Sequence, residues 1–176
     1  MIFSTDKTIE ILEQTPETLI RLTKGLSSFW TNSNEGENTW TVFDVIGHLL
    51  HGEKTDWLVR TKIILSDNFN DPDKSFIPFD RFAQSETSIG KTLAELLDEF
   101  KEIRYNNLLE LKSLEISETD LAKTGIHPEF GTVTLKQLLS TWAVHDLDHI
   151  SQIARIIAKQ YKEETGPWIG FLKILK

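Results

Sequence analysis

The feature that most constrains the fold is a long run of helical periodicity near the C-terminal end of the chain, in residues 134–164. Apolar side chains recur there at intervals of three and four residues, which is the spacing of an amphipathic helix with one buried face. Thr134 is the expected N-cap, and Gln137 three residues later completes a capping box. Gly166 and Pro167 form a typical stop signal. The pattern predicts a helix whose apolar face packs in the core.

Three other segments show the same periodicity, namely residues 5–30, 41–65 and 88–114. In the first, Pro16 predicts a kink or a break, because proline removes a backbone donor and clashes with the preceding turn. The second begins with a near capping box formed by Thr41 and Asp44. No segment predicts a strand. The sequence therefore predicts an all-α protein, a four-helix bundle formed by residues 1–176 as a single domain.

Two long connections separate the predicted helices. Residues 66–87 join the second helix to the third, and loops of that length in compact domains tend to be functional or mobile. This connection can cross one end of the bundle, so the second and third helices need not be antiparallel neighbours. Residues 116–133 join the third helix to the fourth, and we expect the apolar tail, residues 168–176, to pack back on the bundle.

Composition excludes several classes of function. The formal net charge is −8 and no dense run of Lys or Arg occurs, so we expect no nucleic-acid partner and no attraction to an anionic membrane. No apolar stretch approaches the roughly 20 residues that span a bilayer. The chain has no cysteine, which excludes disulfides and thiolate catalysis. Together with the lack of a signal-peptide pattern, this composition predicts a cytoplasmic protein.

Two histidines lie on the predicted core face of the last helix. His145 and His149 are four residues apart, which places both side chains on one face with Cβ atoms roughly 5–6 Å apart. A buried imidazole without a partner costs on the order of 1–3 kcal/mol. One shared metal ion would satisfy both rings. The alternative is that each ring bonds a hydroxyl or a carboxylate across the core, and the spacing alone leaves both interpretations open.

His48 adds a third candidate metal ligand from the second predicted helix. It lies beside the apolar positions of that helix, and bundles commonly build metal sites from side chains on facing helices. Three protein ligands with a fourth position left to water is the arrangement of catalytic zinc sites. His51, one turn away, is the competing candidate, and it can instead contact substrate or solvent.

The sequence resembles the DinB/YfiT-like family in "DVIGHLLHGEKTDWLVR" and in "TWAVHDLDHISQIARI", which is followed by "GPW". The resemblance implies a four-helix-bundle metalloenzyme whose ligands are His48, His145 and His149. It implies one divalent transition metal ion, zinc or nickel most often and iron or manganese in some members. Characterised members of the family include thiol S-transferases and a maleylpyruvate isomerase that use low-molecular-weight thiols. Members are often dimers, so the resemblance also suggests a homodimer.

One motif argues against a peptidase. "HDLDH" has the spacing of the zinc-protease motif HExxH, but Asp146 stands where that motif has glutamate. Aspartate is one methylene shorter, which argues against a general base at that position. Asp146 and Asp148 are otherwise expected to be exposed to solvent.

Three residues are candidates for catalysis. Asp44 lies one turn before His48 and can orient its second ring nitrogen, although a carboxylate at a helix N-terminus is the simpler interpretation. His51 is a candidate from the same helix. His127 lies in the connection before the last helix, where it can act as an acid–base group or contact substrate near one end of the bundle, although a loop histidine that caps a turn is the simpler interpretation.

Three further residues are candidates for substrate binding. Gln152 follows His149 by three residues and can face a cavity. Arg60 can bind an anionic substrate, although solvent exposure is the simpler interpretation for it and for Arg155. Trp142 is expected in the core or in the wall of a cavity.

The leading interpretation is a metal-dependent hydrolase acting on a small molecule, because metal-bound water needs no cosubstrate. A transferase or isomerase is the alternative, and its thiol would have to come from a low-molecular-weight cosubstrate, since the chain has no cysteine. Two other interpretations remain. One is a non-enzymatic metal- or small-molecule-binding stress protein, and the other is a structural bundle whose histidines pair in the core.

Overall fold

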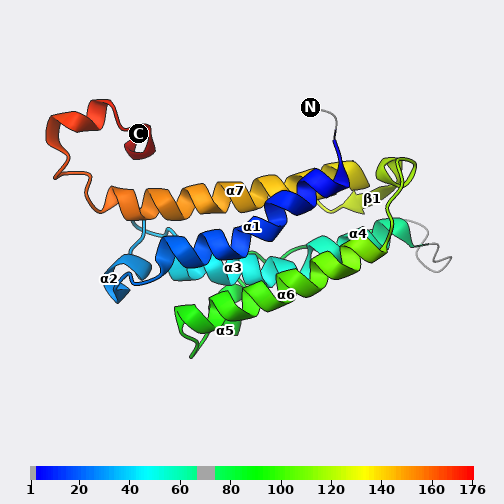
Figure 1. The fold of residues 1–176 in the computed structure, drawn as a ribbon, viewed down its shortest axis with the longest axis horizontal. Helices are drawn as coiled ribbons and strands as arrows, with labels where there is room; N and C mark the ends of the chain where they lie inside the picture. The colour runs from blue at the N-terminus through cyan, green and yellow to red at the C-terminus, as the bar shows by residue number, and fades with distance from the viewer. Residues whose placement is uncertain (1–2, 67–73) are drawn as a thin grey trace.

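The predicted helical segments form a four-helix bundle in the computed structural model of the protein, which describes residues 3–66 and 74–176 (Figure 1). The α-helices are α1 (Thr5–Thr23), α2 (Ser28–Thr31), α3 (Val42–Thr55), α4 (Trp57–Leu65), α5 (Gln84–Thr87), α6 (Leu93–Ser113) and α7 (Leu135–Lys159). The strands are β1 (Thr124–His127) and β2 (Gly131–Thr134), and the short 3-10 helices are η1 (Asp120–Ala122), η2 (Gly166–Gly170) and η3 (Lys173–Leu175).

The long helices run in two directions along the bundle. α1 and α7 run one way, whereas α3, α4 and α6 run the other way (Figure 1). α1 packs against α6 and α7, and α3 packs against the same two helices. The prediction of a long connection between the second and third helical segments is confirmed, and these segments are parallel neighbours. Of this connection, residues 67–73 lie outside the described part of the chain.

Pro16 lies inside α1 and neither ends nor divides the helix. Proline has no N–H to donate to the carbonyl four residues earlier, which belongs to Leu12. The side chain of Arg104 takes over this bond, because its Nη1 donates to the Leu12 oxygen at 2.9 Å. The helix instead ends at Thr23, before the predicted end, and Gly25 follows with φ +82°, a conformation that favours glycine.

Capping boxes fix the starts of three helices. The box predicted for Thr41 and Asp44 is present at the start of α3. The third helical segment begins at Leu93, five residues after the predicted start at residue 88, because Thr92 caps α6 in a capping box with Glu95. The predicted segment 41–65 is interrupted at Asp56, whose non-helical backbone separates α3 from α4.

The last helix begins as predicted and ends early. Thr134 caps α7 in the expected capping box with Gln137, and α7 ends at Lys159, before the predicted end at residue 164. The tail that follows contacts α7 through η3, where Leu175 is buried. Trp168 and Phe171 are exposed, so the expected packing of the tail on the bundle is limited to its last turn.

A β-hairpin precedes α7, which corrects the prediction that the chain has no strand. β1 and β2 pair antiparallel, with His127 opposite Gly131. Gly131 adopts φ +68°, as a tight turn requires. The hairpin packs on α4 at one end of the bundle, and it therefore sets the position of His127.

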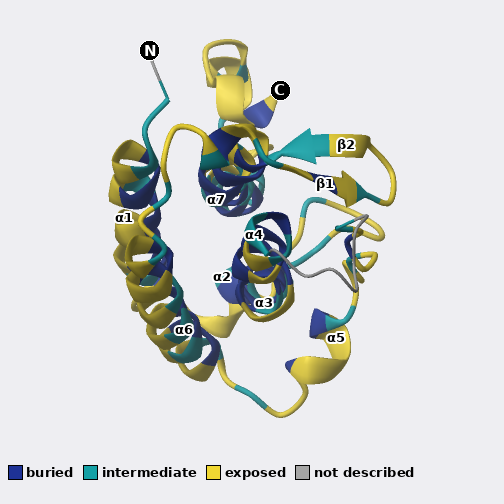
Figure 2. Cartoon of the chain, turned by 90° about the vertical axis from the view of Figure 1, so that its right-hand side faces the viewer, coloured by how far each residue is buried: buried dark blue, intermediate teal, exposed yellow. Residues whose placement is uncertain are grey.

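The core consists of two apolar clusters with a polar layer between them. Each long helix has its buried residues on its inner side (Figure 2). One cluster includes Leu12, Trp57, Leu108 and Trp142, and the other includes Leu19, Leu49, Phe100 and Ile153. The positions between these residues along the helices carry buried polar side chains, namely Glu53, Arg104, Asp146 and His149. In the described part of the chain, no helix combines the length and apolar character needed to cross a membrane.

Candidate metal centre

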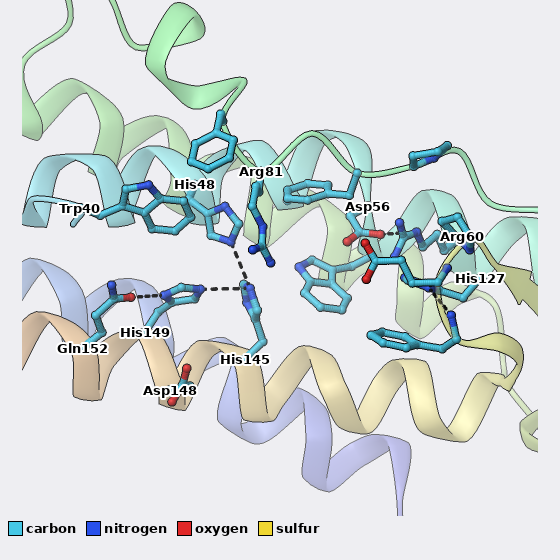
Figure 3. Close-up of a pocket in the computed structure, with 18 of the residues that line it drawn as sticks. Trp40, His48, Asp56, Arg60, Arg81, His127, His145, Asp148, His149 and Gln152 are labelled. Carbon is cyan, nitrogen blue, oxygen red and sulfur yellow. Dashed lines mark hydrogen bonds and ion pairs between the residues drawn. The ribbon is translucent and has the colours of Figure 1, made fainter. Parts of the chain in front are cut away.

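Three imidazole rings from α3 and α7 meet at one point (Figure 3). The Nε2 atom of His145 lies 3.2 Å from Nε2 of His48 and 3.1 Å from Nε2 of His149. His145 and His149 face the same way because they are one turn apart on α7, and His48 reaches them from α3. The structure therefore brings together the three residues that the spacing had selected as ligands.

The distances between these nitrogens suit one shared cation better than hydrogen bonds. A ring nitrogen carries either one proton or one lone pair, so Nε2 of His145 can make a hydrogen bond with only one of its two neighbours. Nitrogens bound tetrahedrally at about 2.0–2.1 Å from a zinc ion lie about 3.3 Å apart. The observed 3.1 and 3.2 Å separations are close to that value. The three-histidine cluster thus fits a metal site.

Burial keeps these imidazoles neutral at pH 7. Desolvation, and after it the neighbouring His149, lowers the pKa of His48 to about 3. The pKa of His145 is also lowered to about 3, mainly by burial and then by His149 and His48. Burial lowers the pKa of His149 as well. Neutral rings offer lone pairs, which a metal ion requires.

Gln152 sets the tautomer of His149. The Gln152 Oε1 atom lies 2.7 Å from His149 Nδ1. An amide oxygen can only accept, so Nδ1 carries the proton and Nε2 is left with its lone pair directed toward the other two rings. The sequence prediction that Gln152 faces the cavity agrees with this position.

Aromatic side chains hold the histidine rings. The Trp40 ring lies 4.7 Å from the ring of His48 and 6.2 Å from that of His149. Trp57 and His145 make an edge-to-face contact with 5.0 Å between ring centroids. These contacts leave the imidazoles little freedom to rotate, so the three Nε2 atoms are arranged before any ion binds.

The three histidines line a cavity of about 800 Å3. Its walls come from α3, α4 and α7, from the hairpin, and from the segment 78–82 that precedes α5. Besides the histidines, the cavity exposes aromatic rings and several charged groups. This volume is ample for a small-molecule ligand beside the metal centre.

Asp56 and Arg60 form a buried ion pair in the cavity wall. Arg60 Nε lies 2.5 Å from Asp56 Oδ1, and Arg60 Nη2 donates to the carbonyl oxygen of Ile77 at 3.3 Å. Only 7% of Arg60 is exposed, which corrects the expectation of a solvated side chain. Burial raises the pKa of Asp56 to about 6 although Arg60 opposes this shift. Asp56 was not selected from the sequence, and it is a proton-transfer candidate.

His127 lies in the same cavity, as its place before the last helix suggested. Its Nδ1 accepts the backbone N–H groups of Glu129 and Phe130, at 3.1 and 3.3 Å, so the neutral ring carries its proton on Nε2. The ring stacks on Phe130 at 4.4 Å between centroids. Burial, and after it Arg60, lowers the pKa of His127.

Three other candidates do not line the cavity. Asp44 accepts hydrogen bonds from the backbone N–H and the hydroxyl of Thr41. It therefore serves as a carboxylate at the N-terminus of α3, which was the simpler of its two interpretations. His51 is half-buried and packs against Phe79. Trp142 is fully buried in the core, so its expected place is the core rather than the cavity wall.

Asp146 is fully buried, which corrects the expectation that it faces solvent. Its carboxylate receives two bonds from Arg104, at 2.6 and 3.1 Å. Arg104 also donates to Glu53 at 2.8 Å, and Trp142 Nε1 donates to the same Glu53 oxygen at 2.9 Å. Arg104 of this network lies near enough to His145 that its charge, after burial and the other two histidines, also lowers the pKa of that ring. Asp148 is exposed, as expected, and lines the cavity.

Comparison with known proteins places this fold and site in a family. The family model described as DinB superfamily matches residues 11–153, a range that includes all three histidines. The chain belongs to the DinB superfamily. Among solved structures, this DinB-superfamily protein is similar to YfiT from Bacillus subtilis, a probable metal-dependent hydrolase with an unusual four-helix bundle topology.

The likeness to YfiT extends over most of both chains. The TM-score is 0.75, and the match covers 91% of this chain and 90% of YfiT, at 19% sequence identity. At that identity the likeness shows the shared fold. No curated protein matches this DinB-superfamily chain in sequence.

Proposed function

We propose that this protein is a metal-dependent hydrolase that acts on a small molecule, with His48, His145 and His149 as the ligands of one divalent transition metal ion. The observation that supports this proposal is the convergence of three neutral ring nitrogens on the wall of a cavity of about 800 Å3. A structural metal site has no need of such a cavity, whereas a catalytic site keeps one position open. The similarity to YfiT, itself a probable metal-dependent hydrolase, supports the same reaction class.

The ligand set restricts the metal. Histidine nitrogens suit zinc, nickel, copper and iron, and the chain offers no thiolate. We propose zinc or nickel as the first candidates, with iron or manganese as alternatives. When bound, such an ion would lower the pKa of a water molecule and polarise a substrate carbonyl.

The chain itself orients the site and moves protons. Gln152 keeps the proton of His149 on Nδ1, while Trp40 packs against His48 and Trp57 packs against His145. Asp56 and His127 line the same cavity and can exchange protons with a bound substrate. A carboxyl with a pKa of about 6 is partly protonated near neutral pH, which suits an acid–base group.

Metal analysis and a hydrolysis assay test the proposal. We expect purified wild-type protein incubated with zinc or nickel to retain about one ion per chain by mass spectrometry. We expect His145→Ala to retain almost none and His51→Ala, on the same side of α3 but outside the cavity, to match wild type. A panel of small esters and amides should be hydrolysed only by the metal-loaded protein, and chelation followed by metal addition should abolish and restore the activity.

Two outcomes would contradict the proposal. One is a wild-type protein that binds none of the candidate metals. The other is hydrolysis that survives chelation. Because the chelation cycle uses the wild-type chain, it decides the matter even where His145→Ala fails to fold.

The size of the cavity supports a second candidate, a transferase or isomerase that uses a low-molecular-weight thiol. A cavity of about 800 Å3 has room for a cosubstrate beside a small substrate. The chain has no cysteine, so the thiol must come from solution. Incubation of metal-loaded protein with small thiols and an electrophile, followed by mass spectrometry of the products, distinguishes transfer from hydrolysis.

A further inference from the structure

The segment from Lys74 to Phe82 leads from the hairpin to the cavity, which residues 78, 79, 81 and 82 line, and it is fixed at several points. Phe76 N donates to the carbonyl of Ile126 in β1 at 2.8 Å, and Ile126 N donates to the carbonyl of Lys74 at 3.0 Å. Farther along, the Ile77 carbonyl accepts from Arg60. Phe82 N donates to the Asp80 carboxylate at 2.9 Å, which forms a tight turn around residue 81.

Arg81, in this turn, directs its side chain into the cavity. Its guanidinium lies beside the rings of His48 and His145 (Figure 3). Its positive charge lowers the pKa of His48. Among the described residues, no carboxylate forms an ion pair with Arg81, whereas the cavity residues Arg60 and Glu35 are both paired.

A guanidinium and a divalent cation repel each other, and an anion bound between them removes that repulsion. The three histidines are neutral and contribute no negative charge to offset either group. Asp146, which follows His145 on α7, is already bound by Arg104. Asp148 also lines the cavity, but its side chain is exposed, so water screens its charge. A ligand with a negative charge would offset the positive charges of Arg81 and the metal ion. A carboxylate suits this position, because a guanidinium binds it through two parallel hydrogen bonds.

The neighbouring walls of the cavity are aromatic. Trp40, Phe79 and Phe82 lie around the histidines, and Phe130 lies at the hairpin end. Phe82 and Phe130 are 62% and 73% exposed, and although one face of Phe130 stacks on His127, much of each ring is open to a ligand. Flat apolar groups pack favourably on such rings.

We propose that Arg81 binds a carboxylate group of the substrate beside the metal centre, and that the rest of the substrate is a flat apolar body that packs on the aromatic walls. This inference rests on the proposed function, because it names the substrate class for the same site. Arg81 thereby becomes a substrate-binding residue contributed by the connection rather than by the bundle helices.

Isothermal titration calorimetry of metal-loaded protein with benzoate and with benzamide tests the inference. Benzamide has nearly the same shape as benzoate and no charge. We expect Arg81→Gln to weaken benzoate binding about 10- to 100-fold and to leave benzamide binding within about twofold of wild type. Arg21→Gln removes an exposed arginine of α1 outside the cavity, and we expect it to match wild type for both probes.

Metal content, measured on each sample, separates failure of the inference from failure of the proposed function. If about one ion is bound but Arg81→Gln and wild type bind benzoate equally, or wild type binds no benzoate, the inference is wrong and the metal centre stands. Equal weakening of benzamide binding also overturns it, because the role of Arg81 would then be structural. If no ion is bound, the proposed function fails, and the same titration on the metal-free chain still decides whether Arg81 binds a carboxylate.

Discussion

Among single residues, His145 has the central place in the metal centre. Its Nε2 atom contacts both other imidazoles, and Trp57 packs against its ring. The next residue of α7, Asp146, is fixed by two bonds from Arg104. The backbone and the ring of His145 are therefore both held by neighbours, and we infer that little reorganisation accompanies metal binding.

We expect the metal-free protein to lose stability as the pH falls from about 6.5 toward 3. In the folded state burial holds the pKa values of His48 and His145 near 3, whereas their ordinary value is 6.5. Between these values the unfolded chain binds more protons than the folded chain, so the free energy of unfolding decreases as protons are added. Urea denaturation of chelator-treated protein at several pH values measures this slope, to which each histidine contributes at most about 1.4 kcal/mol per pH unit.

The double variant His48→Gln, His145→Gln is the control for this pH dependence. Glutamine does not titrate, so the variant should show a shallower fall in stability over the same range. Equal slopes in the two proteins would show that carboxylates, not these histidines, determine the response to acid.

The sequence was informative about residues whose partners are close along the chain. The spacing of four in "HDLDH" predicts that His145 and His149 share one face. The apolar residues near His48 predict that it lies beside the core face of its own helix. Asp146 was misjudged because its partner Arg104 is 42 residues away. Asp146 nevertheless follows the buried Trp142 by four residues, and this spacing on a helix indicates that the two side chains lie on the same buried face. Arg81 carries no local signal, since its position depends on the path of the connection.

At the scale of elements, α6 is tied to its neighbours by Arg104. This one side chain donates to Leu12 of α1, Glu53 of α3 and Asp146 of α7. It is 1% exposed, and the surrounding carboxylates raise its pKa against the effect of burial. The bond to Leu12 also explains why Pro16 is tolerated within α1, since it satisfies the carbonyl that proline leaves without a helical donor.

We expect Arg104→Met to lower the free energy of unfolding by about 3–5 kcal/mol, because it leaves two buried carboxylates without a counter-charge. Urea denaturation monitored by circular dichroism measures the loss. Lys101→Met on the same helix is the matched control, since the Lys101 pair with Glu17 is half-exposed and should contribute far less than the buried network. Similar losses in the two variants would mean that the buried network contributes no more than a surface ion pair.

Helix starts could be predicted better than strands or interruptions. The capping boxes at Thr41 and Thr134 are local patterns, and both are present in the structure. The equivalent pattern at Thr92 and Glu95 is equally local, and it fixes the start of α6. The hairpin escaped prediction because strands of four residues are too short to show a clear alternation of apolar and polar side chains. The interruption at Asp56 was not predicted, because the apolar periodicity continues on both sides of it.

At the scale of the whole molecule, we expect bound metal to stabilise the bundle without altering its secondary structure. The two apolar clusters do not include the histidines, so the fold has its own core. A metal ion present at 100 times its Kd should add about 2.7 kcal/mol to the free energy of unfolding. Denaturation of wild-type protein with and without metal measures the gain, and far-UV circular dichroism should be the same in both states.

His145→Ala is the control for stabilisation by metal, because it lacks one of the three proposed ligands. The variant should unfold at the same denaturant concentration whether metal is added or not. A metal-dependent gain that persists in this variant would place the bound ion somewhere other than the three-histidine cluster.

The parallel course of α4 and α6 has a consequence for how proteins of this shape can diversify. α4 ends at one end of the bundle and α6 begins at the opposite end, so the connection between them runs back along the outside of the bundle. Part of this connection lines the cavity of the metal centre. Surface connections accept substitution and changes in length more readily than packed helices. Selectivity for a different ligand can therefore arise from replacements in this returning stretch, while the helices that hold the ion remain as they are.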